Sequence, residues 1–125
     1  MRALIIDDSS SMRSILRSYM RELKYETFEA ADGKEALQRY DEVGNFDVVL
    51  VDWNMPVMNG LEFVQALRKR EECASVKLMM VTTENDFSRI EQALGAGADE
   101  FVMKPFTLEV LEQKIALLLG GADVS

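Results

Sequence analysis

The fold is decided by the stretch FDVVLVDWNMP, residues 46–56. Val48 to Val51 form an uninterrupted apolar run, which predicts a strand that is buried on both faces, as in a parallel sheet. The strand ends on a carboxylate, Asp52, and turn-forming residues follow it. A lone Asp at the end of a strand usually forms a turn or caps a helix, so Asp52 alone does not indicate a function.

A second acidic position favours a functional interpretation. Asp7 and Asp8 follow another apolar run, residues 3–6. In an open parallel sheet the carboxyl ends of neighbouring strands lie at one edge, and ligands bind there. We therefore expect Asp7, Asp8 and Asp52 to converge at that edge.

Composition and charge limit the possible functions. A length of 125 residues, with 48% hydrophobic and 29% charged residues, is typical of one globular domain. The net charge of -8 argues against nucleic-acid binding through phosphates and against anionic membranes. No apolar run reaches the length of a membrane span, and a single cysteine, Cys73, fits a reducing cytoplasm. The lack of histidine in the sequence excludes His-based metal sites and a phosphohistidine.

Strand-like and helix-like segments alternate along the chain. Helical spacing predicts a first helix with the buried stripe Met12, Ile15, Leu16, Tyr19, Met20 and Leu23. Further strands are predicted at residues 25–30, 76–81 and 101–103. Five strands alternating with five helices predict an α/β fold, a doubly wound parallel sheet with helices on both faces.

Helix boundaries are indicated by capping residues. Serines after Asp8 can cap the first helix, and the later helices are expected to follow Asp32, Asn59, Asp86 and Thr107. The last two helices are expected to end at the glycine pairs Gly95 with Gly97 and Gly120 with Gly121.

Four motifs carry a family resemblance: Asp7-Asp8, VDWNMPVMNG at 51–60, Val81-Thr82, and Lys104-Pro105-Phe106. Together, and in this order, they resemble the receiver domains of two-component response regulators. The resemblance covers the whole chain and implies the flavodoxin-like receiver fold with strand order 2-1-3-4-5. It also implies a receiver domain at residues 1–121, a short tail at 122–125 and no output domain. A receiver domain of a longer regulator and a phosphorelay intermediate remain alternatives, although the Met1 start favours a complete protein.

A cation would relieve the repulsion expected among the three carboxylates. Two carboxylates about 4 Å apart repel by roughly 4 kcal/mol at an effective dielectric constant near 20. Without histidine, the available ligands are oxygen atoms, which indicates Mg²⁺ or Mn²⁺. The resemblance implies that Asp8, Asp52 and the main-chain carbonyl of Asn54 bind the ion directly, with Asp7 acting partly through water.

The resemblance also implies the chemistry. Asp52 would be the phosphoacceptor, a carboxylate nucleophile that takes a phosphoryl group from a histidine kinase. Lys104 and Thr82 would contact the phosphoryl oxygens, with the Lys104-Pro105 peptide bond in the cis form. The protein would not be a conventional enzyme, although it would catalyse its own phosphorylation and dephosphorylation.

The output implied by the resemblance is a conformational switch. An aromatic residue three positions before the lysine turns inward in this family; here it is Phe101, whereas the chemotaxis regulators usually have Tyr. The signal would pass in trans from a cytoplasmic monomer to a partner protein in chemotaxis, such as the flagellar motor switch. Acidic residues on the fourth helix, fifth strand and fifth helix favour a basic or helical target.

Two positions are expected to control how long the protein stays phosphorylated. Asn54 and Glu84 lie two residues beyond Asp52 and Thr82, where they would flank the water that hydrolyses an aspartyl phosphate. Both are polar and not bulky, so we expect water to be admitted and hydrolysis to be fast.

Two other classes of protein share parts of this pattern. An aspartyl phosphatase uses a strand-end Asp nucleophile but typically has a second Asp two residues on, where this chain has Asn54. A flavin binder shares the fold, and residues 9–11 resemble its hydroxyl-rich phosphate loop, but Asp7 and Asp8 would repel a flavin phosphate.

Overall fold

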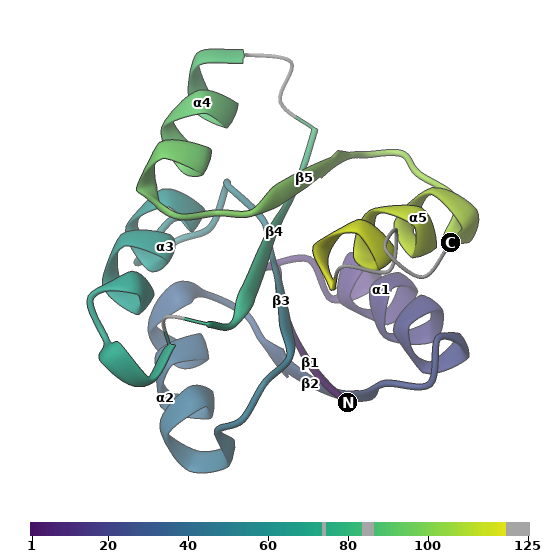
Figure 1. Ribbon diagram of the computed structural model, residues 1–125, viewed down its shortest axis with the longest axis horizontal. Helices are drawn as coiled ribbons and strands as arrows, with labels where there is room; N and C mark the ends of the chain where they lie inside the picture. Colours follow the sequence, from purple (N-terminus) through teal and green to yellow (C-terminus); the bar gives the residue numbers. More distant parts are fainter. Residues whose placement is uncertain (74, 84–86, 120–125) are drawn as a thin grey trace.

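The computed structural model describes residues 1–73, 75–83 and 87–119. Within them, one parallel sheet has the strand order β2-β1-β3-β4-β5 (Figure 1). Its strands are β1 (Arg2–Ile6), β2 (Glu26–Ala30), β3 (Val48–Val51), β4 (Lys77–Thr82) and β5 (Glu100–Met103). The predicted fold class and strand order are both confirmed.

Helices cover both faces of the sheet. They are α1 (Ser10–Glu22), α2 (Gly33–Val43), α3 (Gly60–Arg68), α4 (Phe87–Ala96) and α5 (Leu108–Leu118), with a short 3₁₀ turn η1 (Glu71–Cys73) after α3. Helices α1 and α5 lie on one face, and α2, α3 and α4 lie on the other (Figure 1). None of the helices in the described residues is long and apolar enough to span a bilayer.

The central strands are buried on both faces because their side chains alternate between two cores. Leu4 and Ile6 of β1 point into the core beneath α2, α3 and α4, where Phe63 is fully buried. Ala3 and Ile5 point into the core beneath α1 and α5. An apolar run with no polar alternation is the pattern that this two-sided burial requires.

Capping side chains begin the helices where the sequence indicates. Ser9 Oγ accepts a hydrogen bond from the Met12 N–H at 3.2 Å, and Asp32 Oδ1 accepts one from the Glu35 N–H at 2.8 Å. A capping box joins Asn59 to Glu62 at the start of α3. Thr107 caps α5 through the Val110 N–H. The predicted cap Asp86 and the predicted helix end at 120–121 lie outside the described residues, as does the tail at 122–125.

One detail of the helix predictions is wrong, at Ile15, and another, the end of α4 at Gly95 and Gly97, is confirmed only for Gly97. Ile15, predicted in the buried stripe of α1, is 44% exposed, because it lies at the margin of the stripe while Leu16 and Met20 face the core. Helix α4 runs through Gly95 to Ala96, and the positive φ of 123° at Gly97 follows its end. A single glycine near a helix end does not stop the helix, whereas a left-handed residue does.

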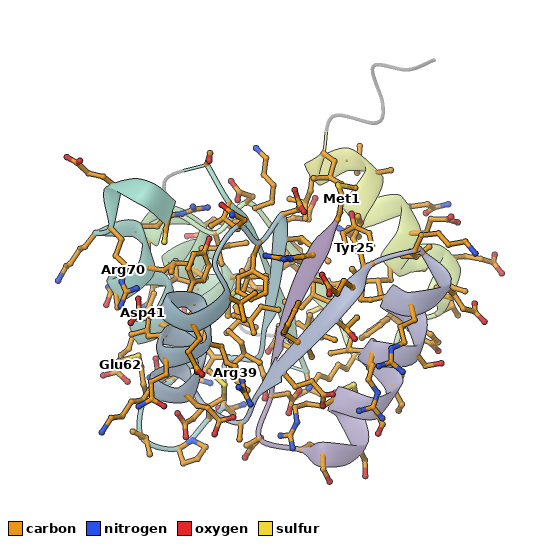
Figure 2. The ribbon with its side chains drawn as sticks, turned by 90° about the horizontal axis from the view of Figure 1, so that it is seen from below. Met1, Tyr25, Arg39, Asp41, Glu62 and Arg70 are labelled. Carbon is orange, nitrogen blue, oxygen red and sulfur yellow. The ribbon has the colours of Figure 1, made fainter. Side chains whose placement is uncertain are left out.

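Arg68, the last residue of α3, and Arg70, just beyond it, connect elements on the face covered by α2, α3 and α4. Arg68 donates to the Gly97 carbonyl at 3.0 Å and to Asp99 Oδ2 at 2.9 Å. Arg70 pairs with Asp41 of α2 at 2.6 Å, and Figure 2 shows these two side chains close together. These contacts link α2, α3 and the connection between α4 and β5.

Gly60 allows the loop after β3 to fold against the strand end. Its N–H donates to the Trp53 carbonyl at 2.9 Å. A Cβ atom on Gly60 would overlap the Asp52 carbonyl oxygen and lie 2.9 Å from the Trp53 Cα. Because both neighbours are backbone atoms, they cannot move aside as a flexible side chain would.

We expect Gly60→Ala to lower the free energy of unfolding by about 1–3 kcal/mol, the usual cost of overpacking. Gly95→Ala is the matched control, because a Cβ there meets nothing within 4 Å and Gly95 is helical. The control should be neutral or stabilising by up to about 1 kcal/mol. Urea unfolding of the parent and both variants measures the difference, and equal stability of the two variants would contradict the close approach at Gly60.

Candidate functional site

The carboxyl ends of β1 and β3 bring three carboxylates together. Ile6 pairs with Val51 in the sheet, and the Asp52 N–H donates to the Ile6 carbonyl at 3.0 Å. One carboxylate oxygen from each of Asp7, Asp8 and Asp52 lies within 4.8 Å of the others. The sequence prediction that these side chains converge is confirmed.

The three carboxylates differ in burial and in partners. Asp7 is 1% exposed and Asp52 is 7% exposed, whereas Asp8 lies at the exposed rim. Asp7 accepts a hydrogen bond from the Ser9 N–H on Oδ1 at 2.9 Å. Its other oxygen, Oδ2, accepts one from Lys104 Nζ at 3.0 Å. Asp7 is thus held on both oxygens, and Asp52 is buried beside it.

Lys104 reaches the carboxylates from the end of β5. Its Nζ lies 3.7 Å from Asp52 Oδ1 as well as 3.0 Å from Asp7 Oδ2, and its side chain is 13% exposed. The Lys104 N–H donates to the Thr82 carbonyl at 2.8 Å, which joins the ends of β5 and β4. The peptide bond to Pro105 is cis, as the resemblance implies.

Burial raises the pKa of the Asp52 carboxyl from 3.8 to about 6. The Lys104 ammonium and a hydrogen bond from the Trp53 main chain lower this pKa, whereas the charges of Asp7 and Asp8 raise it. Burial and like charges outweigh the single ammonium, so the site favours additional positive charge. An all-oxygen set of three carboxylates within 4.8 Å fits a hard divalent cation.

The other residues predicted for the site differ in their burial and in their position. Thr82 ends β4 and is 3% exposed. Asn54 is exposed in the loop after β3, and Glu84 lies outside the described residues. Phe101 pairs with Met80 in the sheet and is partly buried against the core beneath α2, α3 and α4. Lys114 of α5 lies over its ring, with Nζ 4.9 Å from the ring centroid.

The sequence did not indicate the part played by Arg13 of α1. Arg13 Nη1 donates to the Asp7 carbonyl at 2.5 Å, and Arg13 Nε lies 3.3 Å from Glu29 Oε1 on β2. Arg17, one turn further along α1, also pairs with Glu29, at 2.7 Å. The four-residue spacing of these arginines indicates a shared helix face, but only the folded chain places Glu29 opposite them.

An open groove adjoins the acidic pocket. Its volume is about 550 Å³, and its lining comprises Asp8, Trp53, Asn54, Met55, Pro56, Asn59 and Arg89. Arg89 comes from α4, and its guanidinium carbon lies 5.4 Å from the centroid of the Trp53 ring. The groove therefore connects the rim of the carboxylate site with α4.

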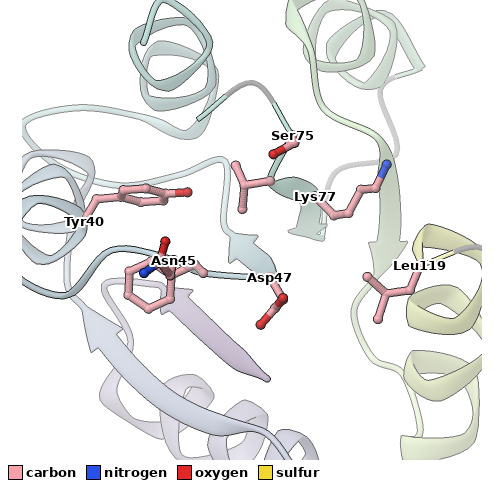
Figure 3. Close-up of a pocket in the computed structure, with 8 residues that line it drawn as sticks. Tyr40, Asn45, Asp47, Ser75, Lys77 and Leu119 are labelled. Carbon is pink, nitrogen blue, oxygen red and sulfur yellow. The ribbon is translucent and has the colours of Figure 1, made fainter. Parts of the chain in front are cut away.

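A second cavity, of about 350 Å³, lies at the opposite end of the sheet (Figure 3). Asp47 and Lys77, which line it, stand at the amino ends of β3 and β4. Leu119, the last described residue, lines the same cavity. Met1 precedes β1 and therefore lies at this end too, beside Tyr25 (Figure 2). The length of the strands separates this cavity from the carboxylates.

Comparisons with known proteins agree with this geometry. The sequence profile of the response regulator receiver domain matches residues 3–116. The chemotaxis protein CheY1 of Helicobacter pylori is 39% identical over 124 residues, which cover 98% of this chain and 100% of that protein. The chemotaxis protein CheY of Pseudomonas aeruginosa is 42% identical over 116 residues, covering 92% of this chain and 93% of that protein.

A solved structure shares the fold as well. The chemotaxis protein CheY4 of Vibrio cholerae matches with a TM-score of 0.88 and 35% sequence identity, over 94% of this chain and 97% of that chain. The profile match, the near full-length relatives and the acidic pocket agree. The chain belongs to the family of response regulator receiver domains.

Proposed function

We propose that the protein is a phosphorylation-dependent signalling switch that accepts a phosphoryl group on Asp52 from a histidine kinase. The observation that carries this proposal is the position of Asp52. Its side chain is buried, 7% exposed, in a cluster of three carboxylates that Lys104 approaches from the end of β5. The relatives named as chemotaxis proteins support the same activity in a chemotaxis pathway.

In the proposed reaction an Asp52 carboxylate oxygen attacks phosphorus as the bond to the donor breaks. Negative charge then spreads over the phosphoryl oxygens, so that catalysis is mostly positioning and charge neutralisation. Asp7, Asp8, Asp52 and the main-chain carbonyl of Asn54 would hold Mg²⁺ or Mn²⁺, whose charge offsets the repulsion between these groups and the phosphoryl oxygens. Lys104 would neutralise a second oxygen, and the Thr82 hydroxyl would donate to a third.

The proposed signal leaves the site through β4 and β5. Thr82 would move toward the phosphoryl group, and Phe101 would turn inward into the space it leaves. Phe101 has no hydroxyl, so packing alone would hold the inward state. The contact of Lys114 with its ring and the ion pair of Lys114 with Glu100, 3.3 Å long, would have to change as Phe101 turns.

We propose that the output acts in trans on a partner protein such as the flagellar motor switch. The surface formed by α4, β5 and α5 carries Glu91, Glu109 and Glu112 in exposed positions, which favours a basic or helical target. In this proposal the protein is a cytoplasmic monomer whose receiver domain spans residues 1–121. A receiver domain of a longer regulator, or a phosphorelay intermediate, would use the same site.

The aspartyl phosphatase and flavin-binding alternatives are not supported. Asn54, which replaces the second Asp of a phosphatase, cannot serve as a general acid. The acidic pocket stands where a flavin phosphate would have to bind. The family assignment is a receiver domain.

Incubation with acetyl phosphate and Mg²⁺ should add one phosphoryl group, mapped by mass spectrometry to Asp52. Asp52→Asn should abolish the addition, because an amide is not a nucleophile here. Asp47→Asn is the matched control, since Asp47 precedes the same strand at its other end. Addition that persists in Asp52→Asn, or that proceeds equally well in EDTA, would refute the proposal.

Without metal, Asp52→Asn should raise the free energy of unfolding above pH 6 by about 1–3 kcal/mol. The folded-state pKa near 6 exceeds the ordinary value of 3.8, so the parent loses stability relative to the variant as pH rises between these values. Below pH 3.8 Asp52 is protonated in both the folded and the unfolded parent chain. The difference in stability between the parent and the variant should therefore disappear. Mg²⁺ at neutral pH should stabilise the parent more than the variant.

Urea unfolding followed by circular dichroism, across pH and with or without Mg²⁺, measures these differences. An Asp52→Asn variant that is less stable than the parent above pH 6, or whose advantage does not change with pH, would contradict the electrostatic account of this site.

Phosphorylated protein should lose its phosphoryl group near the fast end of the range for receivers. Asn54→Met and Glu84→Tyr should lengthen its lifetime by shielding phosphorus from water, with about 1.4 kcal/mol of barrier for each tenfold change. Gln65→Met is the control, since Gln65 is exposed on α3, away from the site. The measurement is the decay of the phosphorylated mass after the donor is removed. Identical decay in all variants would show that these positions do not control water access.

A further inference from the structure

Arg13 of α1 contacts the main chain of the acidic cluster. Its Nη1 donates to the Asp7 carbonyl at 2.5 Å, and its Nε lies 3.3 Å from Glu29 Oε1 on β2. The rigid fork of a guanidinium lets one side chain hold two acceptors at a fixed separation. The side chain of Arg13 is only 20% exposed, so most of it is enclosed by the protein.

Glu29 anchors Arg13 to the sheet. Within β2 it pairs with Ile5 of β1, the strand that leads to the acidic cluster. Its second carboxylate oxygen, Oε2, accepts a hydrogen bond from Arg17 Nη1 at 2.7 Å. Its main-chain carbonyl accepts one from Arg39 Nε at 3.2 Å. The position of the Arg13 guanidinium is therefore set by the sheet as well as by α1.

These contacts tie both main-chain polar groups of Asp7 to β2. The Asp7 N–H donates to the Ala30 carbonyl at 3.1 Å. The Asp7 carbonyl accepts from Arg13, which Glu29 holds. This carbonyl belongs to the planar peptide group that Asp7 shares with Asp8. Fixing that plane also fixes the direction in which the chain enters Asp8.

Asp8 lacks the side-chain partners that Asp7 has. The Ser9 N–H and the Lys104 ammonium each hold one carboxylate oxygen of Asp7. The carboxylate of Asp8 is exposed, and among the residues that the structure describes it accepts no hydrogen bond. Its place in the cluster therefore depends on the main chain that carries it.

We propose that Arg13, held by Glu29, is a positioning residue that keeps Asp8 in place to bind the divalent cation. The inference rests on metal binding by the carboxylate cluster, as proposed above. Arg13 acts through the Asp7 carbonyl and the peptide group that follows it. Because Glu29 offsets the charge of Arg13, the effect on the metal comes mainly from position. Groups that orient metal ligands in this way contribute to metal affinity.

The direction of the change in metal affinity separates this role from two others. A positive charge near the cluster repels a divalent cation, so loss of the Arg13 charge alone should tighten metal binding. Loss of a residue that positions Asp8 should weaken metal binding. If Arg13 only stabilises the fold, its loss should lower the free energy of unfolding without changing the metal affinity of the folded protein.

The experiment measures Mn²⁺ binding to unphosphorylated protein from the loss of the electron paramagnetic resonance signal of the free ion. Arg13→Met keeps an unbranched side chain and removes both polar contacts. Glu29→Gln keeps a hydrogen-bond acceptor and removes the charge that holds Arg13. Arg17→Met is the matched control, because it removes one positive charge paired with the same Glu29 and leaves the contacts of Arg13 in place.

We expect Arg13→Met to raise the Kd for Mn²⁺ about tenfold, the lower end of the usual cost of losing such a supporting contact. Glu29→Gln should raise it about threefold, because a neutral acceptor holds a guanidinium less strongly than a carboxylate does. Arg17→Met should leave the Kd unchanged. Urea unfolding of each variant reports the effect on the fold separately.

Several results would overturn the inference. Tighter Mn²⁺ binding by Arg13→Met would show that its charge dominates, and an unchanged Kd would show a structural role alone. An equal loss of affinity in Arg17→Met would assign the effect to the ion-pair network as a whole. If Arg13→Met does not fold, an unchanged Kd in Glu29→Gln decides against the inference. A parent that binds no Mn²⁺ would instead refute the proposed metal site itself.

Discussion

Repulsion among three carboxylates is the constraint on which the site depends. Parallel pairing of β1 with β3 leaves Asp7 and Asp52 little freedom to separate, because each follows its strand directly. Lys104 approaches both of them, but one ammonium does not offset three negative charges. Burial is the main cause of the raised pKa of Asp52, and the charges of Asp7 and Asp8 raise this pKa further while Lys104 lowers it. A pocket with this excess of negative charge favours hard cations, and burial of Asp52 limits how water can relieve it.

Hydrogen bonds and packing hold the backbone around this pocket, so the three carboxylates cannot easily move apart. The Asp52 N–H is bonded to β1, and Gly60 closes the following loop onto the strand end. The Arg13 guanidinium holds the Asp7 carbonyl and is itself paired with Glu29. Beneath these contacts, apolar layers on both faces of the sheet fix the strand ends. The carboxylates are therefore kept close by the fold as a whole, at an electrostatic cost that local movement cannot remove.

Most of the fold could be predicted because its signals are local. Val48 to Val51 indicated a doubly buried strand, and the caps Ser9, Asp32 and Asn59 marked helix starts that the structure confirms. The convergence of Asp7, Asp8 and Asp52 followed from the geometry of parallel strands, whereas the strand order came from the family resemblance. Periodicity failed at Ile15, since the exact edge of a buried stripe depends on how α1 rotates against the sheet.

Contacts between distant segments could not be predicted in the same way. Arg13 with Glu29, and Arg89 with Trp53, depend on where helices dock, and no short pattern in the sequence encodes those positions. The roles assigned to Thr82, Phe101 and Asn54 remain predictions, and Glu84 lies outside the described residues.

The parallel sheet also separates Met1 and Leu119 from the carboxylate site. Every strand runs toward the carboxylate edge, so Met1 lies at the opposite edge, and Leu119 lines the cavity there with Asp47 and Lys77. A purification tag, fluorophore or fused protein joined before Met1 would start a full strand length away from Asp52. The amino end is thus a natural attachment point for immobilising the protein on a sensor surface with its acidic pocket facing solution.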